Sequence, residues 1–581
     1  MNAFEILARA GALGIRLHVE GDQLRYEAPN ENALTPALIE DLRRNRAEII
    51  RFLRAARSVR ERPPVLPVPD DAPCPLSSAQ QRFYFLDKLE GPSSSYNLSS
   101  AFVLEGALDV AALRASIREI VRRHQILRTR FVSSADGLIQ IVTDWSPEWR
   151  FIDLSGLPQE RRWPVFETIP KRESVRPFNV ADGPHMRAGL VRIASDVHVF
   201  LVDLHHIVSD GGSIDPFVRD LHACYDLYRR GQTPALAPLP VQYRDFAHWQ
   251  RSNASLMSGQ LEYWREKLAG APALVQLPLD RPRPAQQTFC GDTVRAPLGA
   301  DLEGKLERLR GRHGFTPFHC LLGALVVLLN KYSRQDDIVI GTPVSNRPHK
   351  NVEALIGPFL NMIAVRTQLS GDLPLRDVLE RIRQAMIESL DHADVPFEDV
   401  VAALQPERSS SYSPLFNVMF VLEDTPVGIL ELPGLKTTTL NVKTESAKYD
   451  LTLVVQRDSA GLNCWFKYNS DLFDRETIAR MAAHYLNVLA AIADNLEGTL
   501  DGLCVLSPGE RQEQLFTWND TALEFPLHRC THQFFEERAQ KHPAIIALDF
   551  EDHTLTYAET NAKANQLAHF LIAQGVGPES I

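Results

Sequence analysis

The chain has 581 residues, of which 44% are hydrophobic and 23% charged, and its formal net charge is −11 at pH 7. This composition is typical of globular proteins and excludes a largely disordered or fibrous chain. The acidic balance, without a long basic tract, also makes nucleic acid a poor partner. A chain of this length exceeds one ordinary core, so we expect several folding units.

Cellular location is indicated by the apolar runs and the cysteines. The longest apolar run, residues 321–329, is too short for a membrane span, and Glu5 and Arg9 interrupt the stretch that a secretory signal would need. The seven cysteines are odd in number, scattered and never arranged as CxxC, which favours reduced thiols over disulfides or a zinc site. We therefore expect a cytoplasmic protein without a membrane partner.

Residues 1–57 predict a small independent α/β unit of helix, hairpin and helix. Alternation around the turn at Gly21 and Asp22 predicts two strands, and Thr35 followed by Pro36 marks the start of the next helix. The hairpin should turn one set of residues inward, namely Ile15, Leu17, Val19, Leu24 and Tyr26. The opposite face should be cationic and carry Arg16, His18 and Arg25.

The remaining chain is predicted to hold a linker, a large mixed region and a fragment. Six prolines between 58 and 75 remove backbone donors and predict an extended linker. From residue 76 to 506 helical and strand patterns alternate, which predicts two mixed α/β lobes. Representative expectations are a helix at 110–124, a strand at 198–204, a helix at 316–332 and a strand at 337–341. Residues 507–581 resume the alternation and stop before completing a domain.

The most informative segment is residues 198–213, where an alternating strand runs into His205 and His206 and then turns at Asp210, Gly211 and Gly212. A strand end positions side chains reproducibly, and glycines let backbone N–H groups approach a ligand. This arrangement suits acyl transfer, because an imidazole can manage a nucleophile's proton and an amide can receive charge on a carbonyl oxygen. The alternatives are ordinary core or surface histidines and a metal site. Against a metal, strand neighbours face opposite sides and no coordination set is complete.

The same segment carries a family resemblance. His205-His206-Ile-Val-Ser-Asp210-Gly211 matches the signature HHxxxDG of the condensation domains of non-ribosomal peptide synthetases. Six further stretches resemble the other family motifs in order: 76–86 (LSSAQQRFYFL), 123–131 (RHQILRTRF), 243–251 (YRDFAHWQR), 356–366 (IGPFLNMIAVR), 392–398 (HADVPFE) and 413–417 (SPLFN). Gln125 and Pro358 depart from the usual family residues and bear on subtype.

The resemblance implies a fold and a mechanism. The fold would be mixed α/β (α+β), with two chloramphenicol-acetyltransferase-like lobes in a V shape, residues 76–250 and 251–506, preceded by the small docking unit. Phosphopantetheine arms of separate carrier domains would enter a tunnel between the lobes, and no cofactor or metal would be bound by the chain itself. The product would be an amide, formed between a carrier-bound acyl or peptidyl thioester and a carrier-bound aminoacyl amine.

The resemblance also assigns roles within the motif. His206 would contact the attacking amine, as a base or as an orienting group, and Gly211 would lend its N–H to the oxyanion. His205 belongs to the motif but should act mainly in packing. Asp210 would form a bidentate pair with Arg347 that fixes the loop. Asn361 would line the channel, or serve only as a strand-end amide.

Both flanks resemble parts of synthetases. Residues 1–57, through 14–21, 24–26 and 34–36, resemble N-terminal docking domains, whose hairpin receives the C-terminal tail of an upstream subunit. A solubilising cap is the alternative. Residues 534–539 and 555–559 resemble the start of an adenylation domain, without its glycine-rich phosphate loop, and no serine for a phosphopantetheine arm is present. We therefore expect a truncated piece of a longer synthetase that neither activates nor carries amino acids.

Competing functions remain on the same residues. An ester-forming or free-standing acyltransferase is disfavoured by the adenylation-like segment, and epimerisation domains are not normally followed directly by adenylation. Cyclising relatives replace both histidines with aspartates, whereas His205 and His206 are intact. The alternative from another class is a catalytically silent platform that only docks and recruits partners. The sequence leaves the donor, the acceptor, their stereochemistry and the type of upstream protein open.

Overall fold

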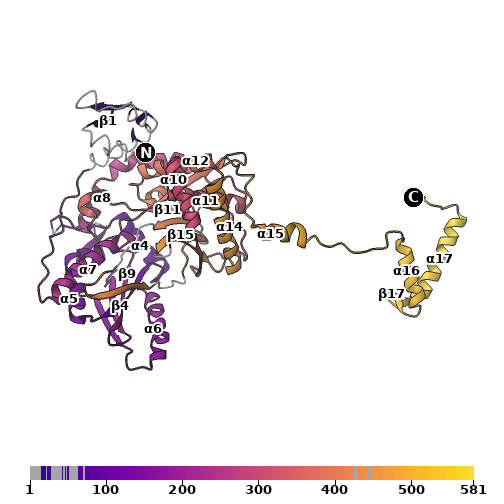
Figure 1. Cartoon of the computed structure of the whole chain (residues 1–581), viewed down its shortest axis with the longest axis horizontal. Helices are drawn as coiled ribbons and strands as arrows, with labels where there is room; N and C mark the ends of the chain where they lie inside the picture. The colour runs from indigo at the N-terminus through magenta and orange to yellow at the C-terminus, as the bar shows by residue number, and fades with distance from the viewer. Residues whose placement is uncertain are drawn as a thin grey trace. The chain divides into compact units, whose positions relative to one another are not determined.

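The computed structural model describes residues 63–580 apart from 70, 71, 136, 408, 424–429, 441–445 and 459–460, together with 15–20, 23–27 and the single positions 39, 42, 43, 46, 49 and 50. The chain divides into two compact units, Met1–Val505 and Leu506–Ile581 (Figure 1). The first unit contains two large sheets with helices around them, as a mixed α/β fold requires.

The first lobe is built on a sheet in the order β14-β4-β9-β8-β7. Its strands are β4 (Asn97–Gly106), β7 (Glu148–Asp153), β8 (Met186–Arg192), β9 (Val197–His205) and β14 (Leu435–Leu440). The helices of this lobe are α4 (Ser78–Glu90), α5 (Val110–Arg123), α6 (Gln159–Ser174), α7 (Ile214–Arg229) and α8 (Tyr243–Ser252). The predicted helix at 110–124 and strand at 198–204 are thus confirmed to within one residue.

Helix α5 shows why the local sequence folds as it does. Asp109 caps its start, with a carboxylate oxygen accepting a hydrogen bond from Ala112 N at 2.9 Å. Leu113, Ile117 and Ile120 recur at helical spacing, are all buried, and pack into one core with residues of α7 and β9. The apolar stripe therefore anchors the helix beside the strand that ends at His205.

The second lobe is built on a sheet in the order β10-β16-β15-β13-β11-β12. Its strands are β10 (Gly291–Pro297), β11 (Asp337–Val344), β12 (Asn361–Gln368), β13 (Val418–Glu423), β15 (Leu451–Asp458) and β16 (Gly461–Asn469). Its helices are α9 (Ser258–Leu268), α10 (Ala300–His313), α11 (Pro317–Ser333), α12 (Leu375–Asp391), α13 (Phe397–Leu404) and α14 (Arg475–Asp494). Strands β11, β13 and β15 run parallel, and the other neighbouring pairs are antiparallel.

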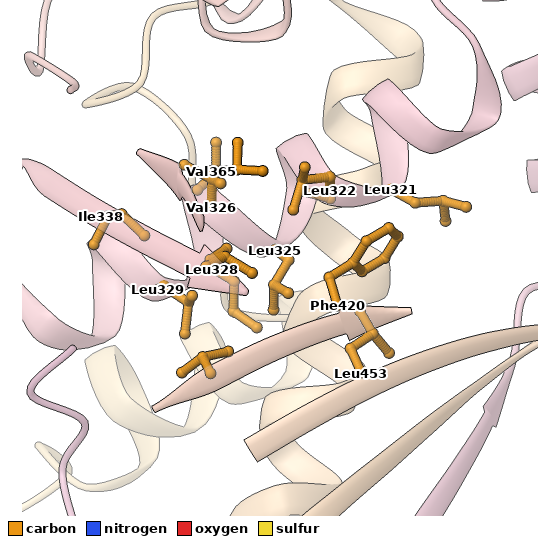
Figure 2. Close-up of a cluster of buried hydrophobic side chains, with 14 of the residues drawn as sticks. Leu321, Leu322, Leu325, Val326, Leu328, Leu329, Ile338, Val365, Phe420 and Leu453 are labelled. Atoms are coloured by element: carbon orange, nitrogen blue, oxygen red, sulfur yellow. The ribbon is translucent and has the colours of Figure 1, made fainter. Parts of the chain in front are cut away.

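Helix α11 is the centre of the second core. It begins where predicted, because Thr316 caps it and Pro317 occupies the first turn, and it extends one residue beyond the predicted end. Leu321, Leu325 and Leu328 are fully buried and face Phe420 and Leu453 of the sheet (Figure 2). The predicted strand at 337–341 is likewise present and continues to Val344.

Two segments cross from the second half of the sequence into the first lobe. Strand β14 pairs antiparallel with β4, from Leu435 opposite Gly106 to Leu440 opposite Ala101. In addition, Val352, Leu355, Ile356 and Phe359 pack into the first-lobe core. A single boundary at residue 250 therefore does not describe how the lobes are built, because these segments bury their apolar residues across it.

The proline-rich segment is extended but does not act as a free spacer from Pro63 onward. Trp249 donates its indole N–H to Pro63 O at 2.6 Å, and Val68 N donates to the Asp245 carboxylate at 2.9 Å. Val65 is fully buried, and β3 (Cys74–Pro75) adds to the hairpin of β5 (Thr129–Ser134) and β6 (Gly137–Val142). From Pro63 onward the segment is thus tied to α8, which the expectation of an extended linker did not include.

The N-terminal hairpin has the predicted strands, β1 (Arg16–Glu20) and β2 (Gln23–Glu27). Leu17 lies opposite Tyr26, and His18 lies opposite Arg25, so the two predicted sets occupy opposite faces. The expectation that Tyr26 faces inward is wrong, since 56% of this side chain is exposed. The flanking helices, with Thr35, Pro36 and Leu38, lie largely outside the described residues, although Leu42, Ile49 and Ile50 are buried.

The second unit is small. It contains α15 (Pro508–Gln512), α16 (Thr531–Lys541), α17 (Tyr557–Ala573) and the antiparallel pair β17 (Ile546–Phe550) and β18 (His553–Thr556). Phe550, Phe570 and Ile572 are more than half exposed. Its elements therefore leave much apolar surface open.

Among the described residues, no single helix is long and apolar enough to cross a membrane. Helices α10 and α11 pass a length and composition test only as a pair, but they are bent by 110°.

Candidate functional site

A cavity of about 490 Å³ lies between the two lobes. Its first-lobe wall is formed by α4, the start of β4 and the loop after β9, and its second-lobe wall by β13, β15 and β16. His206, Asp210 and Gly211 all line it. The structure thus brings three of the four fixed residues of the HHxxxDG signature to one cavity between the lobes.

His206 reaches the cavity because β9 ends one residue earlier. Its backbone N–H donates to Tyr96 O at 2.9 Å, and its ring stacks on Phe83 with centroids 5.5 Å apart. Burial, together with repulsion from Lys448 and His205, lowers the pKa of His206 well below 6.5. The imidazole is therefore neutral at physiological pH and can accept a proton.

His205 takes the opposite direction from its neighbour, as alternation on a strand requires. It is buried, its Nδ1 accepts a hydrogen bond from Ile207 N at 3.1 Å, and its ring meets Phe178 edge to face. Burial, with nearby cationic groups, lowers its pKa to about 3. His205 does not line the cavity, so its position fits the expected packing role.

Asp210 anchors the loop, but not in the predicted manner. Its Oδ2 accepts hydrogen bonds from the backbone N–H groups of Phe359 and Leu360, at 2.8 and 2.9 Å. Arg347 approaches only with Nη2, 3.4 Å from Oδ1. The bidentate pair is therefore wrong, because the backbone of the crossing segment already occupies one carboxylate oxygen.

Arg347 is held mainly by other groups. Its Nη1 donates to Val352 O at 3.0 Å and to Leu355 O at 2.9 Å, and its guanidinium lies 4.2 Å from the ring centre of Phe359. These contacts fix the segment that supplies the two amides to Asp210. Arg347 thus supports the loop through that segment as well as through its contact with the carboxylate.

Ser213 is a loop residue that sequence reasoning missed. Its Oγ accepts hydrogen bonds from Asp210 N at 3.1 Å and Gly357 N at 3.1 Å, and it lies 2.8 Å from Asp210 Oδ1. A Cβ at Gly357 would lie 2.0 Å from the ring of Tyr243, so this position requires glycine. The only sequence signal was the position of Ser213 three residues after Asp210, which is typical of a capping box.

Gly211 and Asn361 lie on the cavity wall in different ways. Gly211 lines the cavity, and a Cβ added to it would meet no atom within 4 Å, so no neighbouring group covers it on that side. The side-chain amide of Asn361 is hydrogen-bonded to the protein backbone. Its Nδ2 donates to Ala393 O at 2.8 Å and to Val395 O at 2.7 Å, and its Oδ1 accepts a hydrogen bond from Phe397 N. Asn361 therefore shapes the wall by holding the start of α13.

Several charged groups in the cavity were not anticipated from sequence. Arg82 forms an ion pair with Glu398 at 3.2 Å, and the ammonium of Lys448 lies 4.2 Å from the ring centre of Tyr96. Burial, followed by repulsion from Arg82 and Lys467, lowers the pKa of Lys448 to about 7. Since these residues come from segments far apart in the chain, no local pattern predicts that they meet.

Other candidate residues lie elsewhere or belong to no site. Among the described residues, no group of three or more His, Cys, Asp or Glu side chains is placed to hold a metal ion. The side chains of Arg16 and His18 lie outside the described residues. Arg25 is exposed on β2.

Comparison with protein families identifies the family of the chain that forms this cavity. The family model "Condensation domain" matches residues 72–515, which is more than half of the chain. The chain belongs to the condensation-domain family. The model "TubC N-terminal docking domain" matches residues 4–55, and "AMP-binding enzyme" matches residues 535–581.

Similar proteins agree with this assignment. A linear gramicidin synthase of Brevibacillus parabrevis is 42% identical over 519 residues, covering 88% of this chain and 7% of that protein. Among solved structures, the X-domain from teicoplanin biosynthesis is 30% identical with a TM-score of 0.70, covering 76% of this chain and 100% of the other. A complex of the X-domain and OxyB is 31% identical with a TM-score of 0.69, covering 77% and 99%. The chain spans only 7% to 14% of the length of such relatives.

Proposed function

We propose that this chain is an amide-bond-forming acyltransferase of non-ribosomal peptide biosynthesis. The observation that carries the proposal is the neutral His206 imidazole facing the cavity between the lobes, which Gly211 also lines. A group that accepts a proton and a backbone that can receive an oxyanion are the two parts that aminolysis of a thioester needs.

The reaction is balanced without any cofactor. The neutral amine nitrogen of the acceptor attacks the thioester carbonyl carbon of the donor, and the carbonyl oxygen takes the negative charge opposite Gly211 N–H. His206 accepts one proton from the nitrogen as the C–N bond forms. When the C–S bond breaks, this proton passes to the departing sulfur, so that the products are one amide and one thiol. Holding both reactants in one cavity supplies much of the rate.

The partners follow from the family. Donor and acceptor would arrive on phosphopantetheine arms of separate carrier domains, and the 4–55 segment would receive the tail of an upstream subunit, as its docking-domain match suggests. The domain division would be a docking domain at 1–57, a linker at 58–75, two lobes at 76–250 and 251–506, and the start of an adenylation domain at 507–581. Strand β14 and the 352–359 segment would count structurally with the first lobe.

The test is reconstitution with two excised carrier domains. One is loaded with a panel of acyl and peptidyl donors and the other with a panel of aminoacyl acceptors, and intact-protein mass spectrometry follows the transfer. We expect the donor mass to move to the acceptor carrier only when the full chain is present. If no pair of the panel reacts faster than without the protein, the proposed activity is wrong.

A second candidate is a recruiting platform without chemistry. It is favoured by one observation, the similarity to an X-domain that was solved in complex with OxyB. The same experiment separates the two, because a platform would bind loaded carriers in a pull-down without transferring the acyl group. The neutral His206 at the cavity favours the catalytic function.

A further inference from the structure

Lys448 is a charged group of the cavity to which the proposed reaction gives no role. It lies shortly before β15 of the second lobe. Its ammonium is 4.2 Å from the ring centre of Tyr96, which directly precedes β4 and lines the first-lobe side of the cavity. Among the described residues, no carboxylate oxygen lies within 4.0 Å of this ammonium. Within these residues, the contact of the ammonium is with the face of Tyr96, a cation–π contact that leaves its charge uncompensated by a carboxylate.

The ring under Lys448 is connected directly to His206. Tyr96 O accepts the backbone N–H of His206 at 2.9 Å. Phe83 joins the two, since it stacks on His206 and meets Tyr96 edge to face with centroids 5.2 Å apart. Lys448 therefore contacts, from the other lobe, the aromatic wall that fixes the imidazole.

The charges around Lys448 are mostly positive or already paired. The titratable and charged groups that line the cavity with Lys448 are Arg82, Tyr96, His206, Asp210, Tyr243, Glu398, Glu423, Tyr449 and Lys467. His205 lies behind this wall, and the charge of Lys448 also lowers its pKa. Of the carboxylates in the cavity, Glu398 is paired with Arg82, Glu423 accepts a hydrogen bond from Gln456, and Asp210 accepts the backbone N–H groups of Phe359 and Leu360. A base and an amine placed here are consequently disfavoured in their protonated forms.

We propose that Lys448 is a positioning residue for the condensation reaction, whose charge keeps His206 and the bound acceptor amine unprotonated while its contact with Tyr96 holds the wall behind the imidazole. The inference rests on the proposed function. It adds a second-lobe residue to a reaction centre whose motif lies entirely in the first lobe.

The direction in which the pH profile should shift follows from the protonation of Lys448 and His206 as the pH falls. Lys448, whose pKa is about 7, gains its charge as the pH falls through neutrality, which is where an ordinary histidine would begin to protonate. Its repulsion then holds the pKa of His206 down. Removing the charge should let His206 and the amine protonate at higher pH, so that the acid limb of the rate profile moves upward.

The test is the pH profile of Lys448→Met in the full chain, measured with a carrier pair that reacts with wild type. We expect the acid limb of kcat/KM to move up by roughly one pH unit, the size of a nearby like-charge effect. Lys448→Arg keeps the cation and should restore the wild-type limb. Lys467→Met is the comparison variant, because it removes a cation that repels Lys448 and leaves the contact between Lys448 and Tyr96 in place. Lys448 should then keep its charge to higher pH, so the acid limb of this variant should not move up.

The outcomes are separable. An unchanged acid limb in Lys448→Met overturns this inference while leaving the proposed function intact, whereas absence of transfer by wild type itself overturns the proposed function. A melting curve checks that each variant folds. If Lys448→Met does not fold, Lys448→Gln is the second variant, because its side chain is polar but uncharged. An unchanged acid limb of the pH profile in Lys448→Gln overturns the inference as well.

Discussion

At the residue scale, two adjacent histidines have different environments because a strand alternates its side chains. His206 lines the cavity against Phe83, whereas His205 is enclosed by aromatic rings and accepts a hydrogen bond from Ile207 N. Both imidazoles are neutral, but only one of them can meet a substrate. A histidine pair can therefore combine one reactive group with one that packs the loop.

His206→Ala should lower the condensation rate by about 10²–10⁴, the usual contribution of one positioned proton-handling group. Its melting temperature should remain close to that of wild type, because the ring lies on a cavity wall. The comparison is His205→Ala, which opens a buried aromatic cluster and should lower the melting temperature while the folded fraction keeps most of its activity. An undiminished rate of His206→Ala with both carriers saturating would show that this histidine is not part of the reaction centre.

Asp210→Ala should lower the free energy of unfolding by roughly 3–5 kcal/mol, because it leaves the Phe359 and Leu360 amides without their acceptor and removes the carboxylate partner of Arg347. Denaturant unfolding measures this loss. In the cycle with Arg347→Met, the double mutant should recover only part of the stability, since the amides remain unpaired in either case. Strictly additive losses would mean that Arg347 and Asp210 do not interact.

The sequence predicts the part of the site that lies within one short segment better than the part that comes from segments far apart in the chain. The HHxxxDG segment is local, so His206, Asp210 and Gly211 could be placed together, and the family resemblance brought Arg347 to Asp210. The geometry was missed, because the amides of Phe359 and Leu360 leave no sign in the sequence. Lys448 is distant from His206 along the chain, and only the packing of two lobes brings it near.

At the scale of elements, α4 and β14 show how the two lobes are connected. Helix α4 begins with a capping box, in which Ser77 and Gln80 exchange hydrogen bonds, and it carries Arg82 to Glu398 of the second lobe. Strand β14 adds to the edge of the first-lobe sheet along its whole length. Helix caps could be found from sequence, but the partner of the Thr-rich β14 could not, since alternation fixes a strand's faces and not its neighbours.

Strand β14 should stay paired with β4 throughout turnover. Glu105 and Lys436 lie directly opposite each other and form an exposed ion pair, so replacing both by cysteine costs little and places two thiols at facing positions of neighbouring strands. In a background with Cys290, Cys504 and Cys530 changed to serine, we expect the double variant to cross-link on oxidation and to retain its condensation rate. Intact mass and turnover before and after reduction measure both effects.

The single cysteine variants are the controls for this cross-link. Activity that disappears on oxidation of the double variant, and returns with a reductant, would show that β14 must detach during the cycle.

At the scale of the whole molecule, the chain joins three parts with different surfaces. The two lobes bury large cores around the cavity, whereas the second unit leaves apolar side chains open and the N-terminal hairpin exposes Tyr26 and Arg25. Composition and the periodicity of the sequence separate these parts well. They do not predict where residues 63–75 attach, because that depends on single hydrogen bonds such as Trp249 to Pro63 O.

The hairpin should bind an acidic partner tail as an added strand. In the described residues β1 and β2 form a two-stranded sheet, and backbone pairing along an outer edge would supply affinity while cationic side chains supply selectivity and encounter rate. Glu27 lies opposite Arg16, whereas Arg25 lies opposite His18, so Arg25 is expected to dominate the attraction. An ordinary solvated hairpin face is the alternative.

Arg16→Glu combined with Arg25→Glu should weaken binding of the C-terminal peptide of the upstream subunit at low salt, with the difference from wild type shrinking as ionic strength rises. Calorimetry on the full chain measures it, while transfer between freely supplied carriers should continue at the wild-type rate. Arg43→Glu with Arg46→Glu is the matched control, because it makes the same change of charge in the same N-terminal region but outside the hairpin. Equal affinity of wild type and the hairpin variant at low salt would remove the electrostatic docking model, and equal weakening by both variants would trace the effect to net charge alone.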